Sequence, residues 1–326
     1  MDQLTGVIVY AKNPDRRLPM ASCTKIMTAL IVLDRISDRT RYITVPAAAV
    51  GAPGATIGLH AGDRITVNTL LAGLLTRSAT DCAITLATAV AGNERAFVVL
   101  MNRRADGLGL ANTRYANASG IAAARHYTSA RDLADLSRIA MRRIAFRDLV
   151  RPTRATLRWQ PGHVLLVESH NVLNRLYDWV DGIKTGSSEL AWRCLASSGE
   201  YGQRRFIVTT LREPTRGQET TDHVLLYHYG ASLYTERIVV AAGAEVTRVP
   251  LDGGGEVVLA AAKTLRAVVR NAASVKVRLR VPASFASLPA TGSIVGTATY
   301  WADGERLGAV QVLAAGQASP SASPQP

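Results

Sequence analysis

The order of the apolar patterns along the chain limits the architectures that it can adopt. Helix-type repeats, with apolar residues three and four positions apart, dominate from residue 22 to about residue 143. Over residues 184–211 the repeat changes to that of β-strands, and a helical pattern follows at 218–234. Beyond residue 235 only short β-type runs remain, separated by Gly and Pro. We therefore expect an α/β domain with an antiparallel sheet flanked by helices, followed by a small all-β sandwich domain.

Length and spacing indicate the domain boundaries. At 326 residues the chain is long enough for two cores of ordinary size. We place one domain at residues 1–237 and a β-rich domain at 238–316. Strands in the second domain are predicted at 245–250, 256–260, 274–281, 294–301 and 307–313. The Ser- and Pro-rich residues 317–326 have too little apolar surface to bury and are predicted to be disordered.

Within the first domain, caps and breakers delimit individual elements. A β-type run predicts a strand at residues 6–10, and a partner strand is expected before Thr5. Residues 191–197 and 205–211 are predicted to form a hairpin. Helices are predicted at 22–34, from Thr66, at about 82–90, at 94–107 and at 129–143, the last opening with a Ser129/Asp132 capping-box spacing.

Charge and composition exclude several functions. The net charge is +13, and six arginines lie between Arg142 and Arg158. Such a basic face attracts polyanions, including an anionic cell envelope, but no motif for reading DNA or RNA accompanies it. No apolar run is long enough for a membrane-spanning helix, and residues 1–3 do not resemble a signal peptide. The chain is expected either in the cytoplasm or starting downstream of an export signal.

Residues 19–28 contain the first candidate chemistry. Ser22 and Lys25 are three residues apart at the start of a helical pattern, so their side chains share one helix face. A serine hydroxyl becomes a nucleophile when a base takes its proton, and a neighbouring lysine amine is such a base. The first turn of a helix also favours developing negative charge. Cys23 points off this face, and we interpret all three cysteines as small buried apolar residues.

Two further motifs follow in order along the chain. Ser78-Ala79-Thr80 lies at the junction of two predicted helices, and Lys184-Thr185-Gly186 begins a late strand. S-x-x-K, a serine-led second motif and K-T-G together form the signature of penicillin-binding proteins and serine β-lactamases. Finding all three in this order is far more specific than finding any one of them.

On these motifs the chain resembles the low-molecular-mass penicillin-binding proteins, the serine-type D-alanyl-D-alanine carboxypeptidases. The resemblance runs over about residues 5–230 and includes residues 61–64, 132–134 and 181–186. It implies removal of the terminal D-alanine from peptidoglycan stem peptides ending in D-Ala-D-Ala, outside the cytoplasm, in the periplasm or at the cell-wall face of the membrane. It also implies covalent inhibition by β-lactams and no cofactor.

The resemblance further implies a role for each site residue. Ser22 would form the acyl-enzyme with Lys25 as base, and Ser78 and Lys184 would relay a proton to the leaving amine. Two lysines in one cleft repel each other, which lowers the pKa values of their amines.

Substrate contacts are implied as well. The N–H groups of Ser22 and Ser187 would form the oxyanion hole. Thr185 would bind the terminal carboxylate, and Gly186 would let the substrate backbone lie against the strand. An arginine should also hold the carboxylate, and Arg212 is our candidate.

One residue departs from the family pattern and keeps two other functions open. The second motif usually ends in asparagine, whereas Thr80 offers only a hydroxyl for positioning the substrate. One alternative is a β-lactamase-like hydrolase, for which Glu168 lies between the second and third motifs but at a spacing that does not match. The other is a catalytically weak protein of penicillin-binding fold that only binds wall peptides.

The histidines predict no catalytic metal. All six lie outside any pattern such as H-E-x-x-H, so metal-dependent hydrolysis is not expected. We expect His126 to pack rather than to catalyse, and Asp63 and Asp181 to hold turns. For Asn171, lining the cleft and stabilising a turn both stay open.

Overall fold

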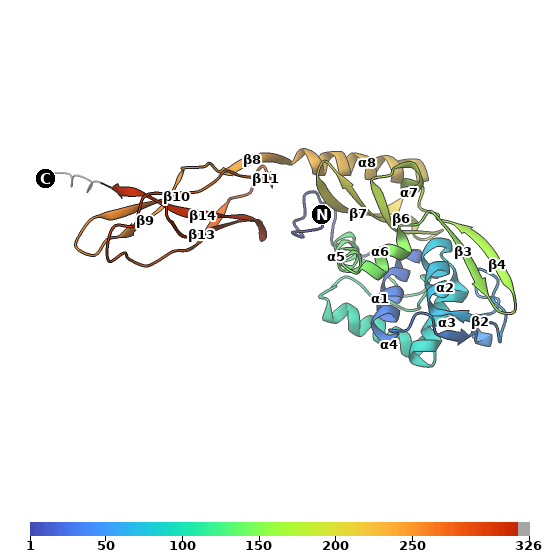
Figure 1. Cartoon of the computed structure of the whole chain (residues 1–326). Helices are drawn as coiled ribbons and strands as arrows, with labels where there is room; N and C mark the ends of the chain where they lie inside the picture. The colour runs from blue at the N-terminus through green and yellow to red at the C-terminus, as the bar shows by residue number, and fades with distance from the viewer. Residues whose placement is uncertain (319–326) are drawn as a thin grey trace. The chain divides into compact units, whose positions relative to one another are not determined.

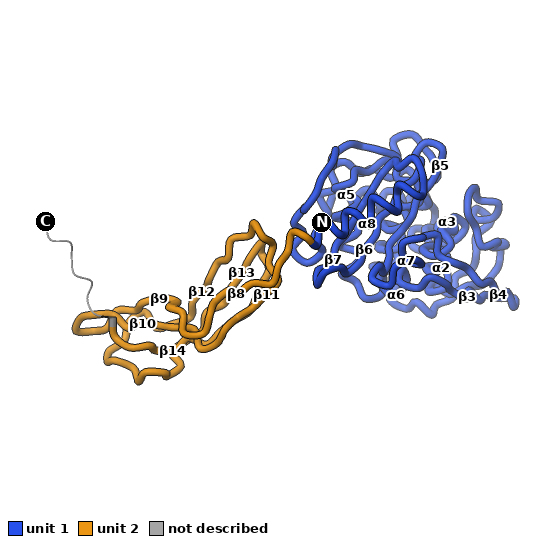
Figure 2. Tube along the Cα trace, turned by 90° about the horizontal axis from the view of Figure 1, so that it is seen from above, with its two compact units in different colours: residues 1–231 blue, residues 232–326 orange. Residues whose placement is uncertain are grey.

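The computed structural model describes residues 1–318, and the chain divides into two compact units, Met1–Ala231 and Ser232–Pro326 (Figure 2). The division precedes the expected boundary at 237/238. The reason is that β8 (Tyr234–Val240) pairs with β11 (Leu265–Arg270) and so belongs to the second unit.

About half of the first unit before residue 151 is helical. Its helices and helical turns are η1 (Ala21–Thr24), α1 (Lys25–Arg35), η2 (Ala47–Ala49), α2 (Val67–Ala72), η3 (Gly73–Arg77), α3 (Thr80–Ala91), α4 (Glu94–Gly107), α5 (Ala130–Met141), α6 (Ile144–Val150), α7 (Val172–Leu176) and α8 (Arg216–Ser232). No single helix among the described residues is long and apolar enough to cross a membrane; α3 and α4 pass that test only as a pair bent by 83°.

Side-chain caps begin several helices, as the sequence predicts. The Thr66 hydroxyl accepts the Thr69 N–H at the start of α2, and the Ser129 hydroxyl accepts the Asp132 N–H at the start of α5. The predicted helix at 94–107 is confirmed as α4. The predicted helix at 22–34 instead begins as the tighter 3₁₀ turn η1 before continuing as α1.

A three-stranded antiparallel sheet forms the centre of the first unit. Its strands are β5 (Val180–Ser188), β6 (Trp192–Tyr201) and β7 (Arg204–Glu213), in the order β5-β6-β7. Helix α8 covers one face, and α1, α5 and α6 lie on the other (Figure 1). Two further antiparallel strand pairs complete the unit: β1 (Tyr42–Thr44) with β2 (Arg64–Thr66), and the hairpin of β3 (Arg154–Trp159) with β4 (His163–Glu168).

The predicted strand at residues 6–10 is wrong. Residues 1–3 pair with the start of β7, where the Gln3 N–H donates to the Arg205 carbonyl at 2.9 Å, and the Asp2 N–H donates to the Val7 carbonyl at 2.8 Å. Beyond this point a groove of about 920 Å³ lies between residues 8–13 and residues 208–213 of β7. Residues 8–10 therefore have no adjacent strand with which to form a ladder.

The second unit is all β, as predicted, with two strands that sequence reasoning missed, β8 and β11. A five-stranded sheet has the order β12-β13-β14-β10-β9, formed by β9 (Glu245–Pro250), β10 (Glu256–Ala261), β12 (Lys276–Arg280), β13 (Ile294–Ala302) and β14 (Glu305–Ala318). The expected disorder is wrong for Gln317 and Ala318, which pair with β10. The rest of that expectation concerns residues 319–326, outside the described residues.

Candidate active site

Ser22 and Lys25 lie where η1 passes into α1. Lys25 Nζ is 3.0 Å from Ser22 Oγ, and the amine donates to the Ser119 carbonyl oxygen at 2.5 Å. Burial lowers the pKa of the Lys25 amine well below its usual value, and the nearby charge of Lys184 lowers it further. The amine is therefore held beside the hydroxyl in a setting that favours its neutral, proton-accepting form.

Two glycines allow other segments to approach the Ser22 turn closely. A Cβ on Gly186 would lie 2.7 Å from the Met20 carbonyl oxygen and 3.1 Å from the Ser22 nitrogen. A Cβ on Gly120, where φ is +88°, would overlap the Ala21 carbonyl. At Gly186 the missing side chain therefore makes room for the protein's own backbone, while the contact with substrate stays a prediction.

A buried hydrogen-bond chain holds the same turn in place. The Ala116 N–H donates to His126 Nδ1 at 3.0 Å, which leaves the proton on Nε2 to donate to Thr24 Oγ1 at 2.7 Å. The Thr24 hydroxyl donates in turn to the Ala21 carbonyl at 2.8 Å. Burial lowers the pKa of His126 to about 4, so the ring is neutral. His126 packs, as predicted; the role of Thr24 was missed because it depends on a residue far along the chain.

Lys184 brings the third motif to the nucleophile. It is 2% exposed, and its Nζ donates to the Thr185 carbonyl at 2.9 Å. Its strand β5 contacts η1, and the Cys23 thiol donates to the Lys184 carbonyl at 3.5 Å. Burial lowers the pKa of the Lys184 amine to about 8. Burial, more than the expected repulsion between the two lysines, is thus the main cause of both lowered pKa values.

The lowered pKa of Lys184 predicts a pH-dependent stability. The amine titrates at about 8 in the folded protein against a usual value of 10.5, so between these pH values the unfolded chain binds more protons. The free energy of unfolding should therefore rise as the pH increases from about 8 to 10.5, and below pH 8 it should be lower by the whole of this rise. We expect Lys184→Met to remove that part of the rise, as measured by urea unfolding at several pH values. Lys12→Met, at an exposed lysine, is the control; equal slopes in both variants would contradict the prediction.

Ser78 sits at a strained junction. It follows the π-helical turn η3, adopts the left-handed conformation with φ 64°, and precedes α3. Ser78 is 6% exposed, and its hydroxyl makes no hydrogen bond within residues 1–318. A non-glycine residue held in this conformation is typical of functional sites. Both η3 and α3 pack on α1, the helix that carries Lys25.

Thr80 and Asp81 hold a loop over the start of α3. The Thr80 N–H donates to the Ala55 carbonyl at 2.7 Å. The buried Asp81 carboxylate accepts the backbone N–H groups of Ile57, Gly58, Leu59 and Cys82 at 3.0, 3.1, 3.2 and 2.9 Å. Asp81 therefore fixes the loop facing the second motif. Sequence reasoning missed this residue, although an acidic residue beside the motif at a helix start was a usable signal.

Removing the negative charge of Asp81 should destabilise the protein. In Asp81→Asn the amide NH₂ would face backbone donors, so we expect a loss of about 3 kcal/mol in the free energy of unfolding. Urea unfolding measures the change, and Asp106→Asn at an exposed position should leave stability unaltered. Equal stability of the two variants would show that the loop does not depend on this carboxylate.

The structure places two arginines at the same end of the sheet as the third motif. Arg212, the predicted carboxylate-binding residue, is exposed, with its guanidinium 4.7 Å from the centroid of the Trp192 ring, beside the groove along β7. Arg193 is the residue paired with Ser187 across the strands, so their side chains share a sheet face. Its Nε lies 3.4 Å from the buried carboxylate of Glu219, whose Oε1 has no partner among the described residues.

Comparison with known proteins identifies the family. The family model described as D-alanyl-D-alanine carboxypeptidase, peptidase S11, matches residues 1–215. The chain belongs to this family.

Named relatives of this carboxypeptidase family match between 72% and 97% of the chain. DacF of Bacillus subtilis, a D-alanyl-D-alanine carboxypeptidase, is 30% identical over 257 residues, covering 77% of this chain and 65% of the relative, so the match spans about two thirds of that protein. The solved DacD carboxypeptidase of Francisella tularensis has a TM-score of 0.67 at 26% identity, covering 97% of this chain and 92% of that one. The Streptomyces K15 DD-transpeptidase has a TM-score of 0.68 at 30% identity, covering 72% and 95%. The roles of the individual site residues stay predictions.

Proposed function

We propose that this protein is a serine D-alanyl-D-alanine carboxypeptidase that acts on peptidoglycan stem peptides through an acyl-enzyme on Ser22. The observation that supports this most is the buried Lys25 amine, 3.0 Å from the Ser22 hydroxyl and with a strongly lowered pKa. A neutral amine at that distance is within reach of the hydroxyl proton.

The reaction would proceed in two halves. Lys25 takes the Ser22 proton while Oγ attacks the carbonyl of the penultimate D-alanine, and the N–H groups of Ser22 and Ser187 stabilise the oxyanion. The C–N bond then breaks, the leaving amine receives a proton through Lys184 and Ser78, and terminal D-alanine departs. Water hydrolyses the ester to free Ser22. A β-lactam would acylate the same Ser22 oxygen through opening of its ring C–N bond, and because the amine stays tethered the product would remain attached.

Surrounding contacts bear on the two alternatives. Glu168, the candidate for a β-lactamase-like water activation, lies at the surface in ion pairs with Arg154 and Arg175 at 2.8 and 3.4 Å. These pairs hold the carboxylate among exposed arginine side chains, which does not favour a role as the general base for a water molecule beside Ser22. The binding-only alternative rests on Thr80, which is 2% exposed and packs near Gly54 in the 50–59 loop. A threonine at this position keeps one hydroxyl group but lacks the amide of an asparagine.

The experiment that tests the proposal combines acylation with turnover. The full chain is incubated with benzylpenicillin and analysed by intact mass, and separately with a peptide ending in D-Ala-D-Ala, from which released D-alanine is measured. We expect one adduct per chain and continuous D-alanine release. An adduct without D-alanine release would show a working nucleophile with weak turnover, and rapid loss of the adduct as penicilloate would favour a β-lactamase. No adduct on folded protein would overturn the proposed function and favour the binding-only alternative.

For the terminal carboxylate of the substrate we propose Arg193 in place of Arg212. Arg193 lies beside Ser187 on β6, whereas Arg212 stacks on Trp192 at the groove. We expect Arg193→Ala to raise KM for the peptide about tenfold, the effect of losing one charge-assisted hydrogen bond of roughly 1.4 kcal/mol. Arg212→Ala, the matched control, should change KM little. The reverse ranking would restore Arg212 to this role.

Two finer proposals concern the setting of the enzyme. Because wall peptides lie outside the cytoplasm, we place its action at the periplasmic or wall-facing side of the membrane.

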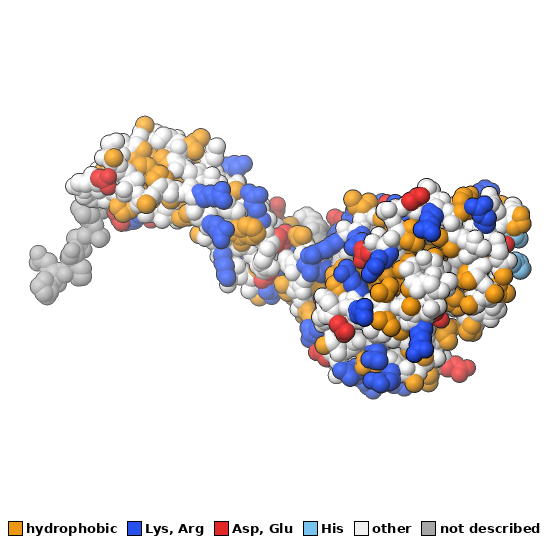
Figure 3. Space-filling model, turned by 90° about the horizontal axis from the view of Figure 1, so that it is seen from below, with side chains coloured by type: hydrophobic (Ala, Val, Ile, Leu, Met, Phe, Trp, Pro, Cys, Tyr) orange, Lys and Arg blue, Asp and Glu red, His pale blue; other side chains and the backbone are white. Residues whose placement is uncertain are grey.

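Lys and Arg side chains are dispersed over the face seen in Figure 3, among few acidic ones. With a net charge of +13, this surface would adhere to anionic wall polymers, in a manner weakened by salt.

A further inference from the structure

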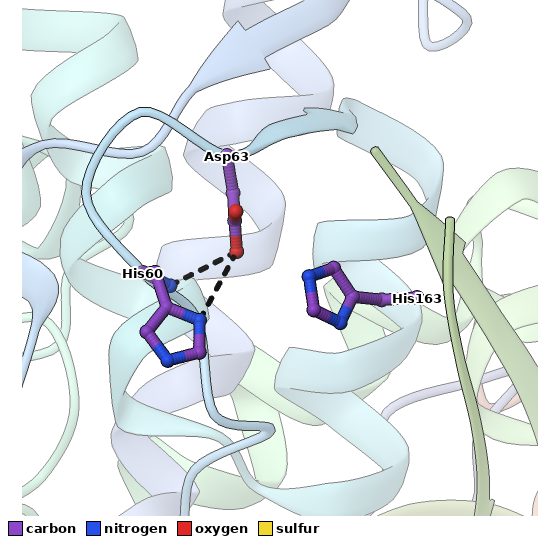
Figure 4. A group of neighbouring side chains, drawn as sticks. All are labelled: His60, Asp63 and His163. Atoms are coloured by element: carbon purple, nitrogen blue, oxygen red, sulfur yellow. Dashed lines mark hydrogen bonds and ion pairs between the residues drawn. The ribbon is translucent and has the colours of Figure 1, made fainter. Parts of the chain in front are cut away.

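A second cluster of chemically competent side chains lies outside the Ser22 site. His60 and Asp63 belong to the turn before β2, and His163 begins β4 (Figure 4). One ligand atom from each residue lies within 4.8 Å of the other two. About a hundred positions separate His163 from the other two, so no local spacing pattern reveals the group.

The carboxylate of this cluster is already oriented. Asp63 is 7% exposed, and its Oδ2 accepts the His60 backbone N–H at 2.9 Å and the Trp159 indole N–H at 3.0 Å. These two bonds fix the turn, as predicted for Asp63, and they hold the carboxylate in the manner of outer-shell partners at metal sites. A carboxylate has about four lone-pair positions, so two remain for a ligand.

Both imidazoles face that carboxylate. His60 Nδ1 lies 3.8 Å from Asp63 Oδ2, and Figure 4 shows a ring nitrogen of His163 directed toward the same point. The His163 ring is stacked on Trp159, with centroids 5.0 Å apart and planes at 17°, which limits its rotation. The His60 side chain is 72% exposed, so little packing opposes its rotation toward the carboxylate. The positively charged guanidinium of neighbouring Arg64 lies over the Tyr42 ring, with its Cζ 5.3 Å from the ring centroid.

We propose that His60, Asp63 and His163 form a binding site for a divalent transition-metal ion of the Zn²⁺ type. Two imidazoles and one carboxylate are the donors that this ion prefers, and a water molecule would complete a tetrahedron. In a tetrahedral site with metal–ligand bonds of about 2.0–2.1 Å, the ligand atoms are about 3.4 Å apart. The present separations of up to 4.8 Å would therefore have to shorten, and rotation of the exposed His60 ring would bring its nitrogen closer.

Such an ion would join two separate parts of the first unit. It would reinforce the link between the turn at residues 60–63 and the β3–β4 hairpin, which is now made by the Trp159–Asp63 hydrogen bond and by the Arg64 and Gln160 backbone groups at 3.0 and 3.4 Å. The proposed serine chemistry makes no use of the ion. The site is therefore a structural clip, and its test is independent of the proposed function.

The test is Zn²⁺ binding to the full chain, prepared without a histidine tag and freed of metal by a chelator. Isothermal titration should give one saturable site, and Zn²⁺ should raise the melting temperature. We expect His60→Ala and His163→Ala to weaken binding at least tenfold, while His228→Ala, at an exposed histidine of α8, binds as the parent does. Melting in chelator verifies that each variant is folded.

A second readout keeps the proposal testable if a variant misfolds. Co²⁺ added to the parent chain should give the intense visible absorption of tetrahedral coordination, and Zn²⁺ should displace it. Absence of saturable binding, or binding that His60→Ala and His163→Ala leave unchanged, would overturn the proposal.

Discussion

Ser22→Ala is expected to abolish both the benzylpenicillin adduct and D-alanine release. Removing the nucleophile of a serine acyl-transfer enzyme costs on the order of 10⁴-fold or more in rate, because no other group can form the ester. The side chain is small and, within residues 1–318, its one hydrogen bond is with Lys25, so the variant should fold normally. Intact mass after a long incubation measures the adduct, and far-UV circular dichroism verifies the fold.

Cys23→Ala is the matched control at the adjacent position. Cys23 is fully buried, its thiol donates to the Lys184 carbonyl, and burial raises the pKa of that thiol well above its usual value. A buried, protonated thiol is a poor nucleophile, so this variant should be acylated at close to the parent rate. An adduct that persists in Ser22→Ala and disappears in Cys23→Ala would move the nucleophile to Cys23.

Replacing Lys25 by methionine should slow acylation on the order of 10³-fold, within the usual contribution of a general base. Methionine keeps much of the buried volume and removes the amine that reaches Ser22 Oγ and the Ser119 carbonyl. The rate of labelling by a fluorescent penicillin measures the effect, with Lys12→Met as the control.

Lys25→Arg separates the charge of the amine from its ability to accept a proton. A guanidinium keeps a positive charge beside Ser22 but cannot be deprotonated in a protein. If Lys25 is the base, the arginine variant should be as slow as the methionine variant. Labelling near the parent rate in Lys25→Arg would instead assign the residue a purely electrostatic role.

Local sequence patterns predicted the parts of the fold that depend on neighbouring residues. The helix from Thr66, the helix at 94–107 and the Ser129 cap all arise from side-chain period and from hydrogen bonds within three residues. The three-residue spacing of Ser22 and Lys25 likewise indicated their contact before the structure placed the amine and hydroxyl 3.0 Å apart. Residues 6–10 show the limit of such patterns, because a strand forms only where a second strand lies alongside it.

The sequence by itself therefore determined several helices and their caps, the change from a helical to an all-β region, the three motifs and the family they resemble. Tertiary structure alone decided that the Gly186 backbone lies against the Ser22 turn, that Arg193 rather than Arg212 lies opposite Ser187, and that His163 faces Asp63. Each of these contacts depends on how helices, strands and turns are oriented relative to one another after they pack. Segments far apart in the chain are brought together by burial of shared apolar surface, which no short-range spacing encodes.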